Sequence, residues 1–271
     1  MMVNMAPVLI GVPWDGSSSF MRGAAGAPAR IRAALWSASS NSWSETGVNV
    51  SAPGALDDAG DLALSADAAE ARAAIESGVG RLLARGATPI VLGGDHSITY
   101  PVMRAFRGHL TGLTIVHLDA HGDLYDEFEG DRFSHACPFA RIMEEGLASR
   151  LLQIGIRTLT AHQREQGKKF GVEIYDATRW AQAPLESVTA PLYLSIDIDV
   201  LDPACAPGVS HPEPGGLSTR EVLSLIHRLP CAVSGADIVE YNPTNDVRDL
   251  TARVAAKMIK ELVGRAELDA S

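Results

Sequence analysis

The residues best suited to chemistry in this sequence are histidines and aspartates, and they fall in three short clusters. The clusters are Gly93-Gly94-Asp95-His96-Ser97, Asp119-Ala120-His121-Gly122-Asp123 and Ser195-Ile196-Asp197-Ile198-Asp199-Val200-Leu201-Asp202-Pro203. Each cluster follows or continues an apolar run of the length of a β-strand. Because open α/β sheets carry their sites at the carboxyl ends of the strands, the sequence predicts that these clusters form a site.

The first two clusters differ in how strongly they indicate a ligand. His96 follows two glycines that permit a tight turn, but a histidine at a strand end is as often packed or solvated as it is a ligand. Asp119, His121 and Asp123 stand at positions i, i+2 and i+4, and alternate residues of an extended segment point the same way. We therefore expect these three side chains to converge on one point rather than to form a solvated acidic turn.

The third cluster places Asp197 and Asp199 in an otherwise apolar strand. Burying two carboxylates there without cations would be very costly, and a divalent metal ion supplies the compensation. Asp202 precedes a proline, so we expect it to cap or shape a turn instead of binding a metal.

Together the clusters supply six candidate ligands, which are His96, Asp119, His121, Asp123, Asp197 and Asp199. Carboxylate oxygens combined with imidazole nitrogens suit Mn²⁺ better than a metal that prefers sulfur. Four carboxylates exceed the need of one ion, whereas two ions that share bridging carboxylates would use them all. The sequence therefore predicts two Mn²⁺ ions per chain, a pair that can activate water and clamp an attacked carbon.

Two more residues would suit a cationic substrate with a planar group such as a guanidinium. Such a substrate needs a buried carboxylate that binds it through two hydrogen bonds, and Glu240 comes directly after an apolar run. A departing amine needs a proton donor, for which His135 is a candidate. The alternative interpretations are a surface glutamate at a strand end and a structural or surface histidine.

The elements that must position these residues alternate between strands and helices. Continuous apolar runs predict strands buried on both faces over Val8–Val12, Pro89–Leu92, Leu113–Leu118, Leu151–Ile156, Leu192–Ile198 and Ala232–Val239. Amphipathic segments predict helices over Ala27–Ala38, Asp67–Arg85, Ser218–Arg228, which opens with a capping box, and Thr251–Val263, which Gly264 would end. The pattern predicts an α/β fold with a mostly parallel sheet covered on both sides by helices. We expect a single domain over residues 1–271, and a surface loop over Asn41–Gly60.

Composition narrows the class of protein further. The 271 residues are 46% hydrophobic and carry a net charge of −10 at pH 7, which argues against nucleic acid and anionic membranes as partners and fits a small cationic substrate. Cys137, Cys205 and Cys231 are widely spaced and odd in number, so we expect reduced thiols. No apolar run reaches the ~18 residues of a membrane helix, and Met1–Pro7 lacks the features of a signal peptide. These observations predict a cytoplasmic protein.

The three clusters resemble, in the same order, the signature motifs of the ureohydrolases, which include arginase, agmatinase and formimidoylglutamase. The segment His117–Arg157 resembles plant-type arginases, as do REQGKKFGVE, APGVSHPEPGGLSTREVL and GADIVEYNP, and the likeness covers essentially the whole chain. The resemblance implies a three-layer α/β/α sandwich, two Mn²⁺ ions and a homo-oligomer of three or six copies.

The resemblance also implies how the two ions would be held. One ion would be bound by His96, Asp119, Asp123 and Asp197, and the other by His121, Asp119, Asp197 and Asp199. Asp119 and Asp197 would bridge the ions, and Asp123 would in addition orient the attacking water.

By the same resemblance, Glu240 would bind the guanidinium, His135 would move protons, and Ser134 and His211 would contact the substrate. The plant-type motifs favour hydrolysis of L-arginine to L-ornithine and urea. The stretch Leu124–Phe128 lacks the asparagine and serine contacts that animal arginases make with the α-amino acid. Hydrolysis of agmatine to putrescine and urea, or of another guanidino acid, therefore stays open.

Two other classes of protein are compatible with this fold. One is the metal-dependent deacetylases, which use a single zinc ion, and the other is a non-catalytic metal-binding protein. The presence of His96 and Asp123, which complete the second metal position, argues against a deacetylase. The presence of every candidate ligand together with Glu240 and His135 argues against a protein that has lost activity.

Overall fold

The structure, a computed structural model, describes residues 7–268 and contains one sheet of eight parallel strands. The strands are β1 (Pro7–Gly11), β2 (Asp57–Asp61), β3 (Thr88–Leu92), β4 (Thr114–Leu118), β5 (Arg150–Ile156), β6 (Glu173–Asp176), β7 (Leu192–Asp197) and β8 (Gly235–Val239). Their order across the sheet is β2-β1-β3-β8-β7-β4-β5-β6. The parallel sheet predicted from the continuous apolar runs is confirmed.

All six predicted strands are present, and the two strands that were not predicted, β2 and β6, form the edges of the sheet. Every residue of β2 is exposed, and every residue of β6 is only partly buried. An edge strand has a neighbour on one side only, so it tolerates polar side chains and produces no apolar run. Because β2 begins at Asp57, the prediction that Asn41–Gly60 is loop throughout was wrong at its carboxyl end.

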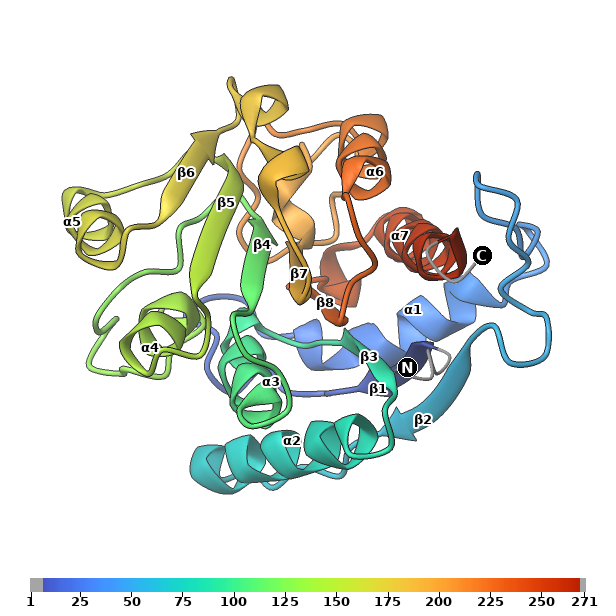
Figure 1. Ribbon diagram of the computed structural model, residues 1–271, viewed down its shortest axis with the longest axis horizontal. Coiled ribbons are helices and arrows are strands. Elements are labelled where there is room, and N and C mark those ends of the chain that lie inside the picture. The colour runs from blue at the N-terminus through green and yellow to red at the C-terminus, as the bar shows by residue number, and fades with distance from the viewer. Residues whose placement is uncertain (1–6, 269–271) are drawn as a thin grey trace.

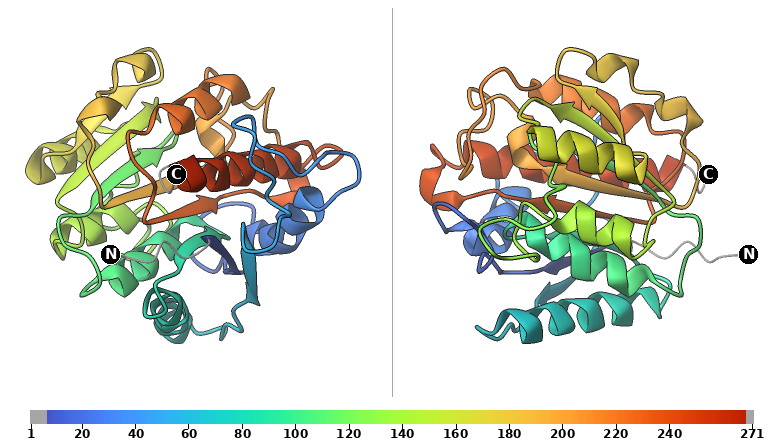
Figure 2. Two further views of the ribbon diagram at one scale, coloured as in Figure 1. Left: turned by 45° about the vertical axis from the view of Figure 1, so that its right-hand side comes forward. Right: turned by 90° about the vertical axis from the view of Figure 1, so that its left-hand side faces the viewer.

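Helices cover both faces of the sheet, which gives the predicted three layers (Figure 1). On one face lie α1 (Ala27–Leu35), α6 (Thr219–Arg228) and α7 (Leu250–Leu268), and on the other lie α2 (Ala68–Leu83), α3 (Thr99–Phe106), α4 (Pro138–Glu144) and α5 (Ala161–Phe170). Figure 2 shows α2, α3 and α4 side by side in the second layer. Within residues 7–268, none of these helices is both long and apolar enough to cross a membrane.

Each helix layer encloses its own apolar core. Along β3, Ile90 and Leu92 belong to the core beneath α1, α6 and α7, whereas Val91 belongs to the core beneath α2, α3 and α4. Successive residues of a strand point to opposite faces, so a strand between two cores must be apolar at every position. This double burial explains why the central strands read as continuous apolar runs.

The four predicted helices are present as α1, α2, α6 and α7, whereas α3, α4 and α5 were not predicted. Ser218 and Glu221 form the predicted capping box, in which each side chain accepts a hydrogen bond from the other residue's backbone N–H. The prediction that Gly264 ends the last helix was wrong, because α7 continues beyond it. A Cβ on Gly264 would lie only 2.5 Å from Thr46 Oγ1 and 2.7 Å from Ser44 Oγ. Glycine therefore serves close packing of a distant loop on α7, not helix termination.

Candidate active site

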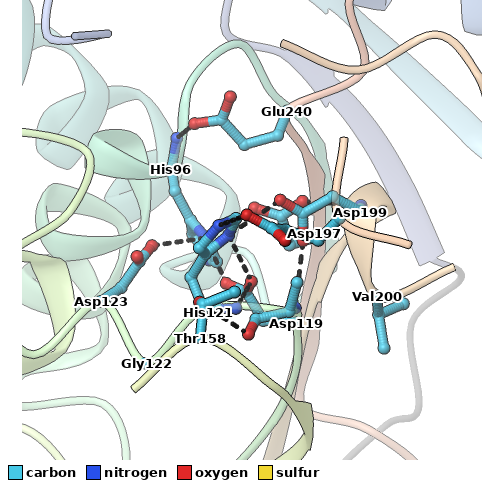
Figure 3. Close-up of polar contacts among 12 residues, drawn as sticks. His96, Asp119, His121, Gly122, Asp123, Thr158, Asp197, Asp199, Val200 and Glu240 are labelled. Atoms are coloured by element: carbon cyan, nitrogen blue, oxygen red, sulfur yellow. Dashed lines mark hydrogen bonds and ion pairs between the residues drawn. The ribbon is translucent and has the colours of Figure 1, made fainter. Parts of the chain in front are cut away.

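Four adjacent strands at the centre of the sheet, β3, β8, β7 and β4, lead into the candidate residues. His96 follows β3, Asp119–Asp123 follows β4, Asp197 is the last residue of β7, and Glu240 follows β8. All four strands are parallel, so their carboxyl ends lie at one edge of the sheet. The topology thereby gathers residues that are far apart in the sequence into one cluster (Figure 3).

His96 lies among three of the predicted carboxylates. Its Nδ1 is 3.3 Å from Asp119 Oδ2, 3.0 Å from Asp123 Oδ2 and 3.1 Å from Asp197 Oδ2. The imidazole ring is fully buried, and the three carboxylates are almost fully buried. Three carboxylate oxygens from different segments therefore converge on one buried imidazole nitrogen.

His121 forms a second group on the other side of Asp119. The His121 Nδ1 is 2.9 Å from Asp199 Oδ2 and 3.4 Å from Asp119 Oδ1. Asp197 connects the two groups, because its Oδ2 faces His96 and its Oδ1 accepts a hydrogen bond of 2.8 Å from the backbone N–H of Asp199. The structure thus brings all six candidate ligands together, in two groups that share Asp119.

The local backbone differs from the extended segments that the spacing predicted. Asp123 has a left-handed φ of 47°, and its backbone oxygen accepts a hydrogen bond of 3.2 Å from Phe139 N–H. Asp199 lies in the 3-10 helix η5 (Ile198–Val200), past the end of β7, and not inside a strand. The side chains converge because the chain turns and tertiary contacts hold the turn, so the argument from alternation was wrong in its geometry.

The buried carboxylates need more positive charge than the two histidines provide. Burial, together with the charges of Asp199 and Asp119, raises the pKa of Asp197 well above its usual range. Burial likewise raises the pKa of Asp199 to about 6. Burial disfavours a charged His96, but its hydrogen bonds to three carboxylates outweigh this and raise its pKa well above the usual value. Clustered oxygen and imidazole donors with excess negative charge fit hard or borderline divalent cations, so the residues present fit a metal centre.

His117 was not predicted as part of the site. This buried residue of β4 places its Nε2 2.8 Å from Asp119 Oδ2, and Gln153 Nε2 lies 3.1 Å from His117 Nδ1. The contacts fix the orientation of the Asp119 carboxylate that both groups share. A signal was present in the sequence, since a histidine two residues before Asp119 in an apolar strand faces the same side of the sheet.

Asp237, which contacts His96 through Ser195, was also not predicted. Inside β8, its carboxylate accepts hydrogen bonds from the hydroxyls of Thr99, Tyr193 and Ser195, at 2.8, 2.8 and 2.6 Å. Ser195 Oγ lies 3.0 Å from His96 Nε2, the ring nitrogen opposite the carboxylate cluster. Contacts of this kind hold a metal-binding histidine in its orientation. The overlooked signal was an aspartate within an apolar strand.

Glu240 lies beside the cluster, and within residues 7–268 only one of its two carboxylate oxygens has hydrogen-bond partners. Its Oε1 accepts a hydrogen bond of 2.8 Å from His96 N–H and lies 3.0 Å from His135 Nδ1. Its Oε2 is buried and has no hydrogen-bond partner within residues 7–268. Burial alone would raise the pKa of Glu240, but the charge and hydrogen bond of His135 outweigh it and lower that pKa. An ionised carboxylate oxygen is therefore available to a cationic donor.

His135 is held between Glu240 and an amino-terminal loop. Its Nε2 lies 2.9 Å from Ser19 Oγ, and its backbone N–H donates to Ser17 O at 3.2 Å. Ser17 N–H in turn donates to the buried carboxylate of Asp95 at 2.9 Å. Burial lowers the pKa of His135, but the Glu240 carboxylate outweighs it and raises the pKa to about 9. His135 is therefore protonated at neutral pH. The sequence predicted no role for Ser17 or Ser19.

A cavity of about 220 Å³ adjoins the cluster. Its lining includes His121, Asp123, His135, Asp197, Asp199, His211 and Glu240, together with Ser19, Tyr125, Phe128, Ala136, Thr158, Gln163 and Glu213. The carboxylates in this lining favour a cationic substrate. The sequence predicted no role for the last seven of these residues, from Ser19 to Glu213. They are scattered along the chain and form no local pattern.

Two residues predicted to contact the substrate differ in their placement. His211 lines the cavity, and its ring centroid lies 5.0 Å from that of His135. Burial lowers the pKa of His211. Ser134 is buried outside the lining, where its hydroxyl accepts a hydrogen bond of 3.4 Å from Ala136 N–H. The structure therefore brings His211 to the cavity but does not bring Ser134 there.

Asp202 shapes a turn, as predicted from its position before a proline. Its Oδ1 accepts from Ala204 N–H at 3.0 Å, and its Oδ2 accepts from Gly215 N–H at 2.8 Å and from Gly216 N–H at 3.3 Å. These bonds tie the segment after Asp199 to the loop that carries His211. Asp202 is absent from the lining of the cavity and acts on the loops around it.

Comparison with known proteins places this architecture among ureohydrolases. The family described as "Arginase family" matches residues 6–264. The protein named "Arginase 1, mitochondrial" from Arabidopsis thaliana is 48% identical over 273 residues, which cover 95% of this chain and 80% of the relative.

Two solved structures show the same fold over nearly the whole length. The arginase from Medicago truncatula superposes with a TM-score of 0.92 at 44% identity, covering 97% of this chain and 88% of the other. The agmatine ureohydrolase of Thermoplasma volcanium superposes with a TM-score of 0.87 at 33% identity, covering 97% of this chain and 91% of the other.

Proposed function

Because this chain belongs to the arginase family, we propose that it hydrolyses L-arginine to L-ornithine and urea. The family and the ureohydrolase relatives decide against the deacetylase alternative. The observation that carries the proposal is Glu240, which lines the cavity beside the candidate metal ligands and has a buried Oε2 without a hydrogen-bond partner within residues 7–268. A buried carboxylate with one engaged oxygen and one open oxygen is suited to bind a planar guanidinium.

We propose that the centre holds two Mn²⁺ ions. One would be bound by His96, Asp119, Asp123 and Asp197, and the other by His121, Asp119, Asp197 and Asp199. The two groups of side chains around Asp119 and their excess negative charge support this proposal. When bound, the ions would supply Lewis-acid activation of a water molecule.

The remaining chemistry is assigned to residues of this chain. Glu240 would hold the guanidinium carbon beside the cluster, and Asp123, which lines the same cavity, would orient the attacking water. His135 carries a proton at neutral pH and lines the cavity next to Glu240, so it would deliver that proton to the departing amine. His211, kept neutral by its burial, would contact the substrate beside His135 without adding a second positive charge.

The cavity must also accept the rest of the substrate. Glu213 supplies a carboxylate that would attract the α-ammonium group of arginine, and Thr158 and Gln163 supply polar groups for its carboxylate. Among the described residues, no arginine or lysine lines this cavity. That absence, like the missing asparagine and serine contacts in Leu124–Phe128, favours agmatine, which has an amine but no carboxylate, as the alternative substrate.

Urea release separates these substrates. We would load the purified protein with Mn²⁺ and measure kcat/KM for arginine, agmatine and guanidinobutyrate, with a chelated control. The proposal expects the highest kcat/KM with arginine and no urea in the chelated sample. A higher kcat/KM with agmatine or guanidinobutyrate would move the assignment to that substrate, and no urea from any of them would refute it.

Three further properties belong to this proposal. The metal content per chain is testable by elemental analysis of the loaded protein. A homo-oligomer of three or six copies is testable by light scattering. A cytoplasmic location is the third property. Its support is that Cys137 and Cys205 are free thiols, the state that cysteines keep in a reducing compartment. The Arabidopsis thaliana relative, in contrast, is named mitochondrial.

A further inference from the structure

A second cavity, of about 610 Å³, is lined by residues of α5 and of the last two strands of the sheet, β5 and β6, together with the segments that connect them. It is separate from the candidate active site, and none of its lining residues lines the first cavity. The two cavities share a wall. Thr158 and Gln163 line the active-site cavity, whereas Arg157, Leu159 and Arg164 of the same segment line the second one.

The charge of this cavity is opposite to that of the chain. Four basic residues, Arg157, Arg164, Lys168 and Arg179, line it, against a single acidic residue, Asp176. Asp176 already pairs with Arg179 at 2.8 Å. In a chain with a net charge of −10, a cavity with this lining is a local concentration of positive charge that the composition does not predict.

Three of the four cations have no carboxylate partner within residues 7–268. The Arg157 guanidinium donates to neutral backbone oxygens, among them Asp199 O at 2.7 Å and Glu213 O at 2.6 Å. Arg164 and Lys168 stand four residues apart on α5, so they lie on the same face of that helix. Among the described residues, neither side chain has a hydrogen bond or an ion pair. Both residues are exposed, so within the described residues their charges are balanced by solvent and not by a protein carboxylate.

The rest of the lining is mainly apolar. Ile156 at the end of β5, Ile174 in β6, and Leu159 and Val172 in the flanking segments face the same space as the cations. A bare inorganic ion would leave this apolar surface and most of the volume unused. A ligand with both an anionic group and an apolar body would use both parts of the lining.

We propose that this cavity binds a small organic anion that carries phosphate or carboxylate groups. The anionic groups lie beside Arg164 and Lys168, and the organic body covers Ile156 and Ile174. Arg157 adds positive charge to the site while its N–H groups stay bonded to backbone oxygens. The acidic active-site cavity selects for the opposite charge, so the anion is not the substrate of the proposed reaction. The inference does not depend on which guanidino compound the enzyme hydrolyses.

Isothermal titration of the Mn²⁺-loaded protein at low ionic strength tests this proposal. The probes are AMP, which joins one phosphate to a flat ring, and glutarate, a dicarboxylate without a ring. We expect saturable binding of at least one probe, and which one binds identifies phosphate or carboxylate as the preferred group. Affinity should fall as salt is added, because exposed charges are screened.

Two double variants of equal charge decide where the probe binds. In Arg164→Gln/Lys168→Gln, affinity should fall about ten-fold or more, because two cations that face the anion are removed. In Arg85→Gln/Lys169→Gln, which removes two cations outside the cavity, one of them on α5, affinity should stay the same. Both variants should keep the urea release of the parent protein, which shows that they are folded.

Several results would overturn the proposal. They include no saturable binding of either probe at millimolar concentration, and unchanged affinity in Arg164→Gln/Lys168→Gln, which would place the anion outside this cavity. If neither probe binds and light scattering shows that this variant changes the mass of the assembly, the cavity is an interface between copies and the proposal is wrong.

Discussion

Replacing Glu240 with glutamine removes the charge of the proposed guanidinium ligand with little change in shape. The native Oε1 accepts from His96 N–H and faces His135 Nδ1, and the amide oxygen of glutamine can keep this position. The amide NH₂ group then occupies the place of the open Oε2. A group that accepted hydrogen bonds from the substrate thus becomes a donor that faces another donor.

The expected loss follows from the burial of this residue. Glu240 is only 4% exposed, so the guanidinium–carboxylate pair forms away from bulk water. Removing one partner of a buried ion pair costs about 3–5 kcal/mol. At about 1.4 kcal/mol for each ten-fold change in rate, kcat/KM should fall about 10²- to 10⁴-fold. The metal ligands are untouched, so the metal content should not change.

The assay measures kcat/KM for urea release together with the manganese content per chain and the melting temperature. Glu127→Gln is the matched control, because Glu127 is exposed and absent from the lining of the cavity. It should retain the activity of the parent protein. If Glu240→Gln keeps kcat/KM within about three-fold of the parent with full metal content, Glu240 does not bind the guanidinium and the reasoning fails. A loss of activity with a matching loss of manganese would show that Glu240 supports the metal centre instead.

Four other predictions follow from the structure. Asp123→Ala should lose one metal ion per chain and most urea release, and two ions with full activity would refute its assignment. His135→Asn should slow turnover about 10²-fold with unchanged metal content, whereas a metal-depleted variant would make His135 structural. Glu240 raises the pKa of His135 to about 9. The stabilisation of the fold by this pair should therefore be complete below about pH 6.5 and lost as the pH rises through about 9. Thermal melts of the parent protein and of His135→Asn across this pH range measure it. Gly264→Val should destabilise the fold by about 1–3 kcal/mol, because Ser44 and Thr46 leave no room for the new side chain. The control Gly80→Ala should not destabilise the fold, because a Cβ at Gly80 meets nothing within 4 Å. Equal melting temperatures for the parent protein and Gly264→Val would contradict the packing argument.

The central part of the fold could be predicted from the sequence because its pattern is local. Strands between two cores must be apolar at every position, so their runs are visible without any knowledge of their neighbours. The same logic identified Asp197 as unusual, since a carboxylate at the end of such a strand needs compensation. The edge strands β2 and β6 escaped prediction because they have one neighbour each and their side chains are exposed or partly buried.

The sequence predicted which residues form the candidate site but not the backbone conformation that brings them together. Asp119, His121 and Asp123 converge through a turn in which Asp123 has a φ of 47°, a conformation that no spacing rule indicates. The supporting residues His117 and Asp237 were missed although each is a polar residue in an apolar strand. Their partners come from other strands and loops, so their role becomes visible only when the strands are side by side.

The sequence by itself determined which strands are buried and which polar residues follow them, because both properties depend on neighbours along the chain. It also determined the chemistry of the ligands, since that depends on residue type alone. Only the tertiary structure decided that β8 and β7 lie between β3 and β4, which sets His96 within hydrogen-bonding distance of Asp197 and Glu240. Tertiary structure alone also left Ser134 out of the lining of the active-site cavity and formed a second cavity between α5 and the strands β5 and β6, because both results depend on how separate elements pack against one another.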